Sequence, residues 1–160
     1  MRQSFRATQS DSHPACLALD RWLHGHPELH TLAIYSPLLG EVDLSSLPRQ
    51  RPDLRWLYPK VHACQLTFHF GSQLLPGAFG ILEPIADSPA IAITEIDAFI
   101  CPGLAFDPRG GRLGRGRGFY DRVLAQARPD ALKIGICFAH QSVPDTFAEP
   151  HDIPMDIVIF

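Results

Sequence analysis

The chain has 160 residues, which is the size of a single domain and enough to bury a hydrophobic core. Hydrophobic residues make up 46% of it and charged residues 19%, a composition that excludes an intrinsically disordered chain. The formal net charge is −3, so no overall positive field would draw the protein to DNA or to an anionic membrane. We therefore expect one domain over residues 1–160.

The four cysteines are widely spaced and include no CxxC pair. Cys101 and Cys137 lie in apolar runs that are typical of buried strands, which favours reduced thiols over disulfides. No apolar run approaches the ~18 residues of a membrane span, and we find no apolar segment of a signal peptide at the N-terminus. We therefore expect a cytoplasmic protein.

Residues 1–13 are polar and show no pattern, so we expect a loose arm there. Apolar residues after Pro14 recur with the 3.6-residue period of a helix, and Gly25 should end that helix. The apolar run at 31–35 then predicts a buried strand. A polar loop over 36–43 follows it.

The middle of the chain predicts two strands and a loop. A short strand at 56–58 should end at Pro59-Lys60. Residues 66–70 alternate apolar and polar side chains, which is typical of a half-exposed strand. Residues 77–84 contain two glycines and one aromatic side chain, Phe79, and predict a loop.

The last third predicts three strands and one helix. A strand at 97–101 leads into an arginine-rich loop, and a helix from about 118 to 128 should end at Pro129. Two further buried strands are expected at 133–138 and 156–160. Apolar strands separated by helices and long loops predict an α/β domain whose largely parallel sheet is covered on both faces.

The stretch RGGRLGRGRG, residues 109–118 and here called the arginine–glycine loop, is the strongest functional signal. Glycine lets backbone N–H groups approach a ligand closely, and guanidinium groups bind phosphate. Five of the fourteen basic residues fall within 109–122, and such a local cluster in a balanced chain indicates a small anionic ligand. Ligands of parallel sheets bind beyond the carboxyl ends of strands, where this loop lies. We expect it to hold a polyphosphate.

Two other interpretations of the loop remain open. A flexible surface loop with solvated arginines would have the same composition, and RGG-like tracts bind nucleic acid. We disfavour both, because clustered arginines repel one another unless an anion neutralises them, and because core elements flank the loop. The stretch lacks the GK[ST] ending of a P-loop and the GxGxxG spacing of a dinucleotide site.

Two aspartates are candidate metal ligands. Asp121 lies in the first turn of the predicted helix, where the helix dipole favours a carboxylate whether or not it binds a metal. Asp152 precedes the final strand. Mg²⁺ bound to a nucleotide takes only one or two protein carboxylates, so these two would suffice if the fold brings them together. The eight histidines show no zinc-ligand spacing.

The stretch PGLAFDPRGGRLGRGRGFYDRVL strongly resembles the signature of the 5-formyltetrahydrofolate cyclo-ligase (5,10-methenyltetrahydrofolate synthetase) family, PGLAFD-x-x-G-x-RLGxGxGYYDR-x-L. Four further segments resemble that family in the expected order: IYSPLLGEVDL, LYPKV, GAFGILEP and HDIPMDIVIF. The resemblance covers about residues 32–160. It implies a Rossmann-like, three-layer α/β/α sandwich with a mostly parallel central sheet, of the cyclo-ligase and CoA-transferase type.

The resemblance also implies an activity. Members close the ring of 5-formyltetrahydrofolate to give 5,10-methenyltetrahydrofolate, with ATP as cosubstrate and Mg²⁺ as cofactor, and release ADP and phosphate. The formyl oxygen is phosphorylated first, and N10 of the folate then displaces phosphate from this imidate phosphate. We accordingly expect small-molecule substrates, no nucleic-acid or membrane partner, and a monomer or weak homodimer.

The resemblance assigns site residues position by position. ATP would contact Arg112, Leu113, Gly114, Arg115, Gly116, Arg117, Gly118, Phe119 and Tyr120. The folate would contact Ser36, Glu41, Phe79, Arg115, Gly116, Arg117, Gly118 and Phe119. Arg115, Arg117 and Tyr120 would be catalytic, and Asp121 and Asp152 would hold Mg²⁺. Glu41 would accept hydrogen bonds from the pterin, and Phe79 would cover its ring.

The chain departs from the family pattern at two places. Family members begin with a long helix that carries a K-x-x-x-R pair, whereas only about thirty residues precede the first predicted strand here. Arg2 and Arg6 have the spacing of that pair. Phe119 replaces the first tyrosine of the YYD triplet. The alternative function is therefore a cyclo-ligase-like protein that binds a nucleotide or folate without closing the ring.

Overall fold

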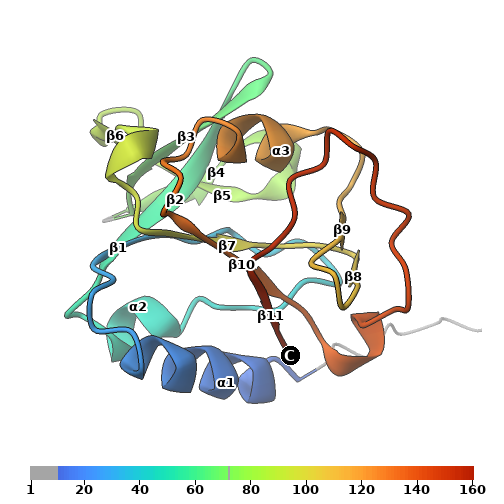
Figure 1. The fold of residues 1–160 in the computed structure, drawn as a ribbon. Helices are drawn as coiled ribbons and strands as arrows, with labels where there is room; N and C mark the ends of the chain where they lie inside the picture. Colours follow the sequence, from blue (N-terminus) through green and yellow to red (C-terminus); the bar gives the residue numbers. More distant parts are fainter. Residues whose placement is uncertain (1–10, 72) are drawn as a thin grey trace, which may run out of the picture.

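A seven-stranded sheet forms the middle layer of the structure, a computed structural model that describes residues 11–71 and 73–160 (Figure 1). Its strands are β1 (Thr31–Ala33), β2 (Arg55–His62), β3 (Gln65–Phe70), β6 (Ala90–Ile91), β7 (Ala98–Cys101), β10 (Leu132–Ile136) and β11 (Ile157–Ile159). They lie in the order β11-β10-β7-β1-β2-β3-β6. The first five of these pair in parallel, β3 pairs antiparallel with β2, and β6 pairs antiparallel with β3, so the predicted, mostly parallel sheet is confirmed.

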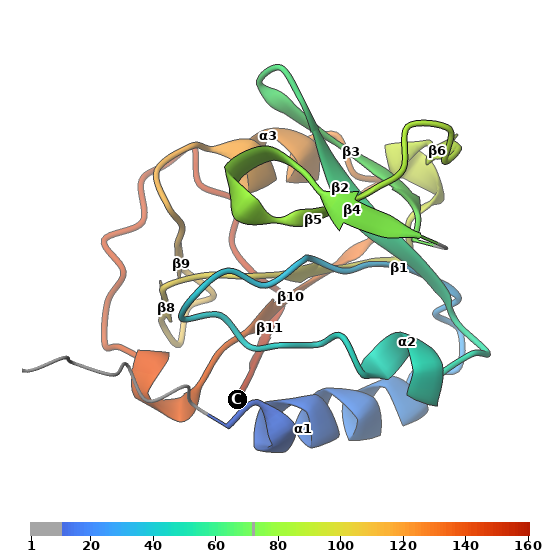
Figure 2. The same ribbon diagram turned by 180° about the vertical axis from the view of Figure 1, so that it is seen from behind.

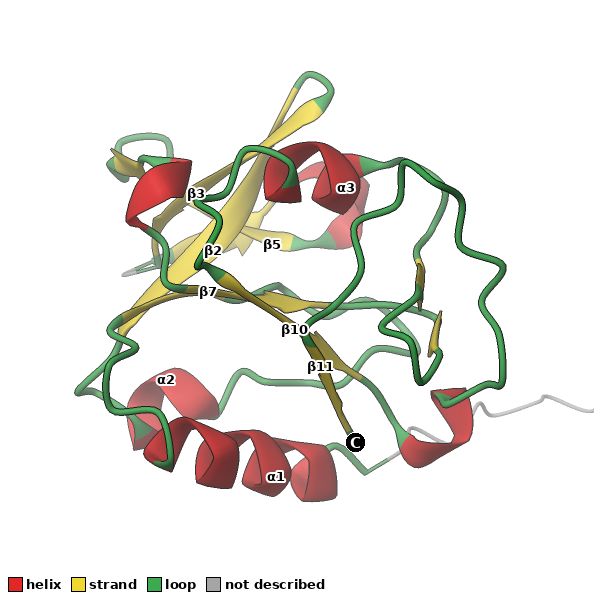
Figure 3. Ribbon diagram, viewed as in Figure 1, coloured by secondary structure: helices red, strands yellow, loops and turns green. Residues whose placement is uncertain are grey.

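Helices cover both faces of the sheet, as expected for a three-layer sandwich (Figures 2 and 3). One face carries α1 (His13–His24) and α2 (Leu47–Gln50). The other carries α3 (Phe119–Leu124) and a two-stranded hairpin of β4 (Leu74–Pro76) and β5 (Leu82–Pro84). A second hairpin joins β8 (Ala105–Phe106) to β9 (Arg112–Leu113). Short 3-10 turns form η1 (Ala78–Gly80), η2 (Ile93–Glu95) and η3 (Ala139–Gln141).

The sheet is buried on both faces because its central strands are apolar throughout. Leu32 and Ile100 pack into the core beneath α1, whereas Ala33 and Phe99 face the core beneath α3. This two-residue alternation places apolar side chains on each face in turn. Burying one large apolar side chain contributes about 1.5–3 kcal/mol, so these two cores hold the loops beyond the strand ends in place.

The first helix is confirmed with small shifts. It begins at His13, with Pro14 in its first turn, where the missing N–H has no helical partner to lose. The Gly25 N–H caps its C-terminus by donating to the Trp22 carbonyl. Most of the expected loose arm, residues 1–10 with Arg2 and Arg6, lies outside the described residues. Within the described chain, no helix has both the length and the apolar character needed to cross a bilayer.

Several predicted boundaries were wrong. β2 continues through Pro59 because β1 pairs with it only as far as Leu57, and a proline is tolerated where one side of a strand has no ladder. The strand at 65–70 is less exposed than predicted, since His69 is buried and hydrogen bonded to the Ser88 carbonyl. The predicted loop at 77–84 contributes β5 and η1 to a hairpin.

The predicted helix at 118–128 is shorter than expected. α3 ends at Leu124, and the following N–H groups of Gln126 and Ala127 bond three residues back rather than four. Pro129 has no N–H with which to continue the helical ladder. With six residues, α3 contributes less of a helix dipole to the loop before it than the sequence predicted.

A buried carboxylate fixes the turn between β8 and β9. Asp107 is 3% exposed and accepts hydrogen bonds from the N–H groups of Arg109 and Gly111 at 2.8 and 3.1 Å. It also accepts the N–H and the hydroxyl of Thr146 at 3.0 and 2.6 Å. The Thr146 hydroxyl, together with the three N–H donors, holds the pKa of Asp107 well below its usual range despite burial. Asp107 therefore ties the segment 143–156 to the β8–β9 hairpin.

Replacement of Asp107 by asparagine should lower the free energy of unfolding by about 2–3 kcal/mol at pH 7, because a charged acceptor of several donors is lost. Since the pKa of Asp107 is lower in the folded than in the unfolded state, its contribution is complete above the unfolded value near ~4 and is lost as the pH falls. Urea denaturation of both proteins should show the difference shrinking from about pH 5 to pH 2. A difference independent of pH would contradict this role.

Candidate active site

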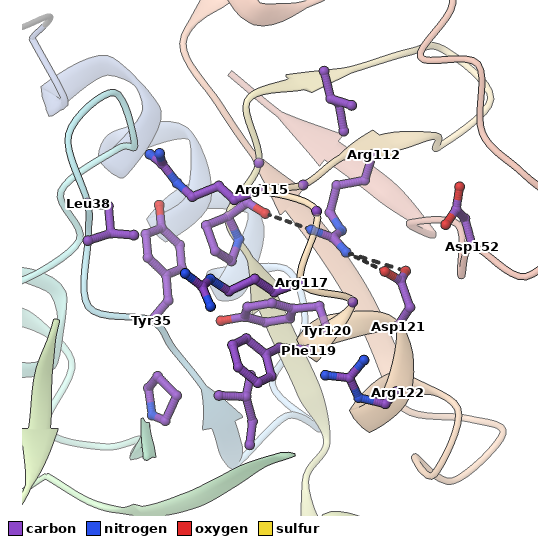
Figure 4. A pocket seen from close by; sticks show the side chains of 18 of the residues that line it. Tyr35, Leu38, Arg112, Arg115, Arg117, Phe119, Tyr120, Asp121, Arg122 and Asp152 are labelled. Atoms are coloured by element: carbon purple, nitrogen blue, oxygen red, sulfur yellow. Dashed lines mark hydrogen bonds and ion pairs between the residues drawn. The ribbon is translucent and has the colours of Figure 1, made fainter. Parts of the chain in front are cut away.

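A cavity of about 840 Å³ lies beside the arginine–glycine loop (Figure 4). Its walls include residues that follow β1 and β7, the β9–α3 connection, and the segment that leads to β11. Every site residue expected from the sequence lines it: Ser36, Glu41, Phe79, Arg112, Leu113, Gly114, Arg115, Gly116, Arg117, Gly118, Phe119, Tyr120, Asp121 and Asp152. The structure thus brings these residues together, while the ligand that each contacts stays a prediction.

Arg112 is the buried arginine of the cavity. Its Nη2 donates to both carboxylate oxygens of Asp121 at 3.2 and 3.3 Å, and its Nη1 donates to the Pro102 carbonyl at 3.3 Å. The guanidinium also lies over the Tyr120 ring, 5.4 Å from the centroid. Its buried Nε has no hydrogen-bond partner within the described chain. Arg112 is therefore held rigidly with one donor still to be satisfied.

Arg115 crosses the cavity to the loop that follows β1. Its Nε donates to Glu41 Oε1 at 3.0 Å, and its Nη2 donates to the Leu39 carbonyl at 2.7 Å. The other Glu41 oxygen accepts the Leu38 N–H at 2.9 Å. The Glu41 side chain is only 5% exposed, so Arg115 pairs with a buried carboxylate. This ion pair closes one side of the cavity.

Carboxylates from elsewhere in the chain neutralise three of the clustered arginines. Besides Arg112 and Arg115, Arg109 pairs with Asp145 at 2.6 Å on the surface. The sequence argument that an external anion must neutralise the cluster was therefore wrong for these three. Among the described residues, Arg117 and Arg122 make no ion pair. They lie over aromatic rings instead, Arg117 over Phe79 at 3.8 Å and Arg122 over Phe119 at 5.3 Å.

An apolar wall faces these arginines. It is formed by side chains from β2, β3 and the β4–β5 hairpin: Pro59, Val61, Leu66, Phe79 and Ile81. Phe79 is 51% exposed and has a left-handed backbone with φ +56°, a costly conformation for a bulky residue. The Ser36 hydroxyl donates to the Leu82 carbonyl and so attaches this hairpin to the loop after β1. Such a wall suits a flat, largely apolar ring.

The two tyrosines of the cavity stay protonated at neutral pH. Burial raises the pKa of Tyr120 well above its usual value, and neighbouring Cys101 adds to the effect. Burial likewise raises the pKa of Tyr35, whose hydroxyl donates to the Val42 carbonyl at 2.6 Å. Tyr120 can therefore donate a hydrogen bond to a ligand but cannot serve as a base.

Asp121 and Asp152 lie at one end of the cavity, opposite Tyr35 and Leu38 (Figure 4). Asp121 Oδ1 accepts the Ile153 N–H at 3.3 Å, which joins the start of α3 to the residue after Asp152. Asp152 Oδ2 accepts the Glu149 N–H at 2.7 Å. The described chain contains no cluster of three or more His, Cys, Asp or Glu side chains placed to hold a metal. Two carboxylates that line one cavity suit a cation that takes its remaining ligands from phosphate and water.

Some cavity residues escaped sequence reasoning. Thr146 and Phe147 line the same cavity as Asp152, although nothing in the sequence near them indicated a site. The stretch AFDPRGG did contain a signal for the turn that fixes Thr146. An aspartate at the start of a turn often accepts hydrogen bonds from the backbone N–H groups of that turn. The histidine-rich stretch at 24–30 does not line the cavity.

Comparison with known proteins agrees with these features. Residues 20–160 match the model of the 5-formyltetrahydrofolate cyclo-ligase family. A 5-formyltetrahydrofolate cyclo-ligase of Escherichia coli is 32% identical over 140 residues, and the match covers 81% of this chain and 77% of that protein. The enzyme of the same name from Mycolicibacterium smegmatis is 41% identical over 87 residues, which cover 54% of this chain and 45% of that protein. The chain thus spans about half the length of the second relative in the match.

Solved structures extend the likeness to the fold. The 5,10-methenyltetrahydrofolate synthetase of Mycoplasma pneumoniae is similar with a TM-score of 0.75 and 27% identity, covering 92% of this chain and 83% of that one. The synthetase of Aquifex aeolicus gives a TM-score of 0.80 at 31% identity, covering 92% of this chain and 76% of that one. With the signature stretch, the cavity built around it and these matches, the chain belongs to the 5-formyltetrahydrofolate cyclo-ligase family.

Proposed function

We propose that this protein catalyses the ATP- and Mg²⁺-dependent closure of 5-formyltetrahydrofolate to 5,10-methenyltetrahydrofolate, with release of ADP and phosphate. The observation that carries the proposal is that the arginine–glycine loop, Glu41 and the two aspartates line one cavity. This arrangement combines arginines that can bind an anion, a carboxylate that can accept hydrogen bonds from a flat ring, and aspartates that can bind a cation. Family membership supports the same assignment.

The polyphosphate of ATP would lie along the arginine–glycine loop. Arg112 lines the cavity with a guanidinium fixed by Asp121, and Arg117 makes no ion pair within the described chain. Gly116 has φ +78° and open space where a side chain would begin, so the backbone there is accessible to a ligand. Asp121 and Asp152 would hold Mg²⁺, which when bound neutralises charge on the phosphates.

The folate would occupy the side of the cavity that holds Glu41 and the apolar wall. Pterin N–H groups need an acceptor, and the buried carboxylate of Glu41 lines the cavity, held by Arg115 and the Leu38 N–H. Phe79 would cover the ring from the β4–β5 hairpin. For the pterin to reach Glu41, Arg115 must turn away from that carboxylate. A phosphate in the loop offers the guanidinium another anionic partner.

The reaction then follows from placement and charge. The formyl oxygen attacks the terminal phosphorus of ATP, and ADP leaves. N10 of the folate attacks the formyl carbon of the resulting imidate phosphate, loses its proton and expels phosphate. Arg115 and Arg117 would neutralise charge on the transferred group, and Tyr120, protonated at neutral pH, would donate a hydrogen bond.

We also propose that the protein acts in the cytoplasm. All four cysteines are free thiols, and Cys101 and Cys137 are buried in the core. Burial raises the pKa of the Cys101 thiol to about 12 and that of Cys137 to about 11, so both are unreactive at neutral pH. Free, buried thiols suit a reducing compartment.

The direct test of the activity is ATP-dependent formation of the near-UV-absorbing methenyl product from 5-formyltetrahydrofolate. The purified protein should form it with Mg²⁺ and ATP, and omission of either should abolish the signal. Binding of nucleotide and folate without product would overturn the assignment as a ligase and favour the binding-protein alternative.

Replacement of Arg115 by alanine should lower kcat/KM by about 10²–10³-fold, because a guanidinium that stabilises developing charge is lost. The control is Arg49→Ala, which removes an exposed arginine of α2 that does not line the cavity. Its kcat/KM should stay within about twofold of the wild type, since an exposed side chain far from a site contributes little. Melting temperatures of both variants exclude unfolding as the cause. Wild-type activity of Arg115→Ala would show that Arg115 has no catalytic role.

A further inference from the structure

Phe147 combines two unusual properties. Its side chain is 84% exposed, the highest value among the large hydrophobic residues of the described chain. Its backbone has φ +54°, in the left-handed region that bulky side chains rarely adopt. A conformation that costs free energy and exposes an aromatic ring persists only where the surroundings impose it, and such residues cluster at functional sites.

The surroundings of Phe147 do impose this conformation. Its N–H donates to Asp145 Oδ1 at 2.8 Å, and Asp145 is itself paired with Arg109. The preceding residue, Thr146, is fixed by the buried carboxylate of Asp107 through its N–H and hydroxyl. The segment from η3 to β11 runs beside the β8–β9 hairpin in both views (Figures 1 and 2). The backbone at Phe147 is therefore fixed before any ligand arrives, and the ring projects into solvent.

Phe147 lines the cavity two residues before Glu149, whose N–H donates to Asp152. The neighbouring cavity residues Glu149 and Asp152 are acidic, and His151 lies within 3.4 Å of the former and 3.6 Å of the latter. Acidic side chains repel a phosphate group that has no bound cation, but they tolerate an uncharged, planar group. An exposed aromatic ring offers that group a stacking surface.

We propose that Phe147 is the stacking platform for the adenine base of the bound nucleotide. This inference rests on the proposed function, and it adds the place of the base to that of the phosphates. The phosphates lie along the arginine–glycine loop, so the nucleotide extends past Asp121 and Asp152 toward the segment 143–156. The pterin is not the ring that stacks here, because Glu41 accepts the Leu38 N–H and Leu38 lies across the cavity from Asp152 (Figure 4).

The experiment compares three probes by calorimetric titration: Mg-ADP, Mg-tripolyphosphate and 5-formyltetrahydrofolate. Phe147→Ala should weaken Mg-ADP binding by about tenfold to a hundredfold, the usual effect of losing one base–aromatic stack. Binding of Mg-tripolyphosphate and of the folate should change less than about twofold, because neither contains the base. Phe147→Trp should keep the affinity for Mg-ADP.

Two further variants control for structure. Phe147→Asn removes the ring but suits a left-handed backbone, so it should reproduce the loss seen with alanine while keeping the loop conformation. Phe160→Ala removes an exposed phenylalanine that does not line the cavity, and it should bind all three probes as the wild type does. As a crossed comparison, Glu41→Gln should weaken binding of the folate without weakening that of Mg-ADP, because Arg115 then loses a carboxylate that competes with the phosphates.

Several results would overturn the inference. Unchanged Mg-ADP affinity in Phe147→Ala and Phe147→Asn would show that the base lies elsewhere, and equal losses for Mg-ADP and Mg-tripolyphosphate would show a purely structural role. Loss of folate binding alone would make Phe147 part of the folate site. Concentration-dependent self-association that the variants abolish, with Mg-ADP binding intact, would assign the ring to a second copy of the chain. A wild-type protein that binds none of the three probes would instead overturn the proposed function itself.

Discussion

The shape of the cavity depends on the pairing of clustered arginines with carboxylates from distant parts of the chain. Arg115 and Glu41 are 74 positions apart and meet across the cavity, while Arg112 is fixed by Asp121 at the start of α3. These ion pairs let several guanidinium groups converge without a ligand, and they orient the arginine–glycine loop toward the cavity. In the proposed reaction, a bound polyphosphate would replace Glu41 as the anionic partner of Arg115. That exchange would release Glu41 for the pterin, so the same contact would connect the two substrates.

A second carboxylate, that of Asp107, fixes another part of the cavity wall. Through Thr146 it fixes the segment that bears Phe147 and Asp152, and the Ile153 N–H joins that segment to Asp121. Both aspartates expected to hold Mg²⁺ therefore belong to one hydrogen-bonded unit with the arginine–glycine loop. The sheet contributes by burying both of its faces, which places the loops of β1, β7 and β10 at the same edge.

Much of the fold and most of the cavity could be predicted from the sequence. Buried parallel strands are nearly continuous apolar runs, and the dense signature around Arg115 identified the loop and its neighbours. Pro59 was misinterpreted because its tolerance depends on where a neighbouring strand ends, which is a tertiary fact. The arginine–carboxylate pairs were missed for the same reason. The sequence shows that the arginines are close together, but it does not show which distant carboxylates pair with them. Phe147 could not be found at all, because its exposure and left-handed backbone exist only in the folded chain.

The exchange of partners around Arg115 can be observed directly by NMR of the arginine Nε–H groups during titration with Mg-ADP. The account predicts that the Arg115 Nε–H resonance shifts strongly as its bond to Glu41 is replaced, whereas that of Arg109, outside the cavity, stays in place. If a saturating titration leaves every resonance of residues 109–121 unmoved, the nucleotide does not bind at this loop. The assignment of the cavity as a cyclo-ligase active site would then be contradicted.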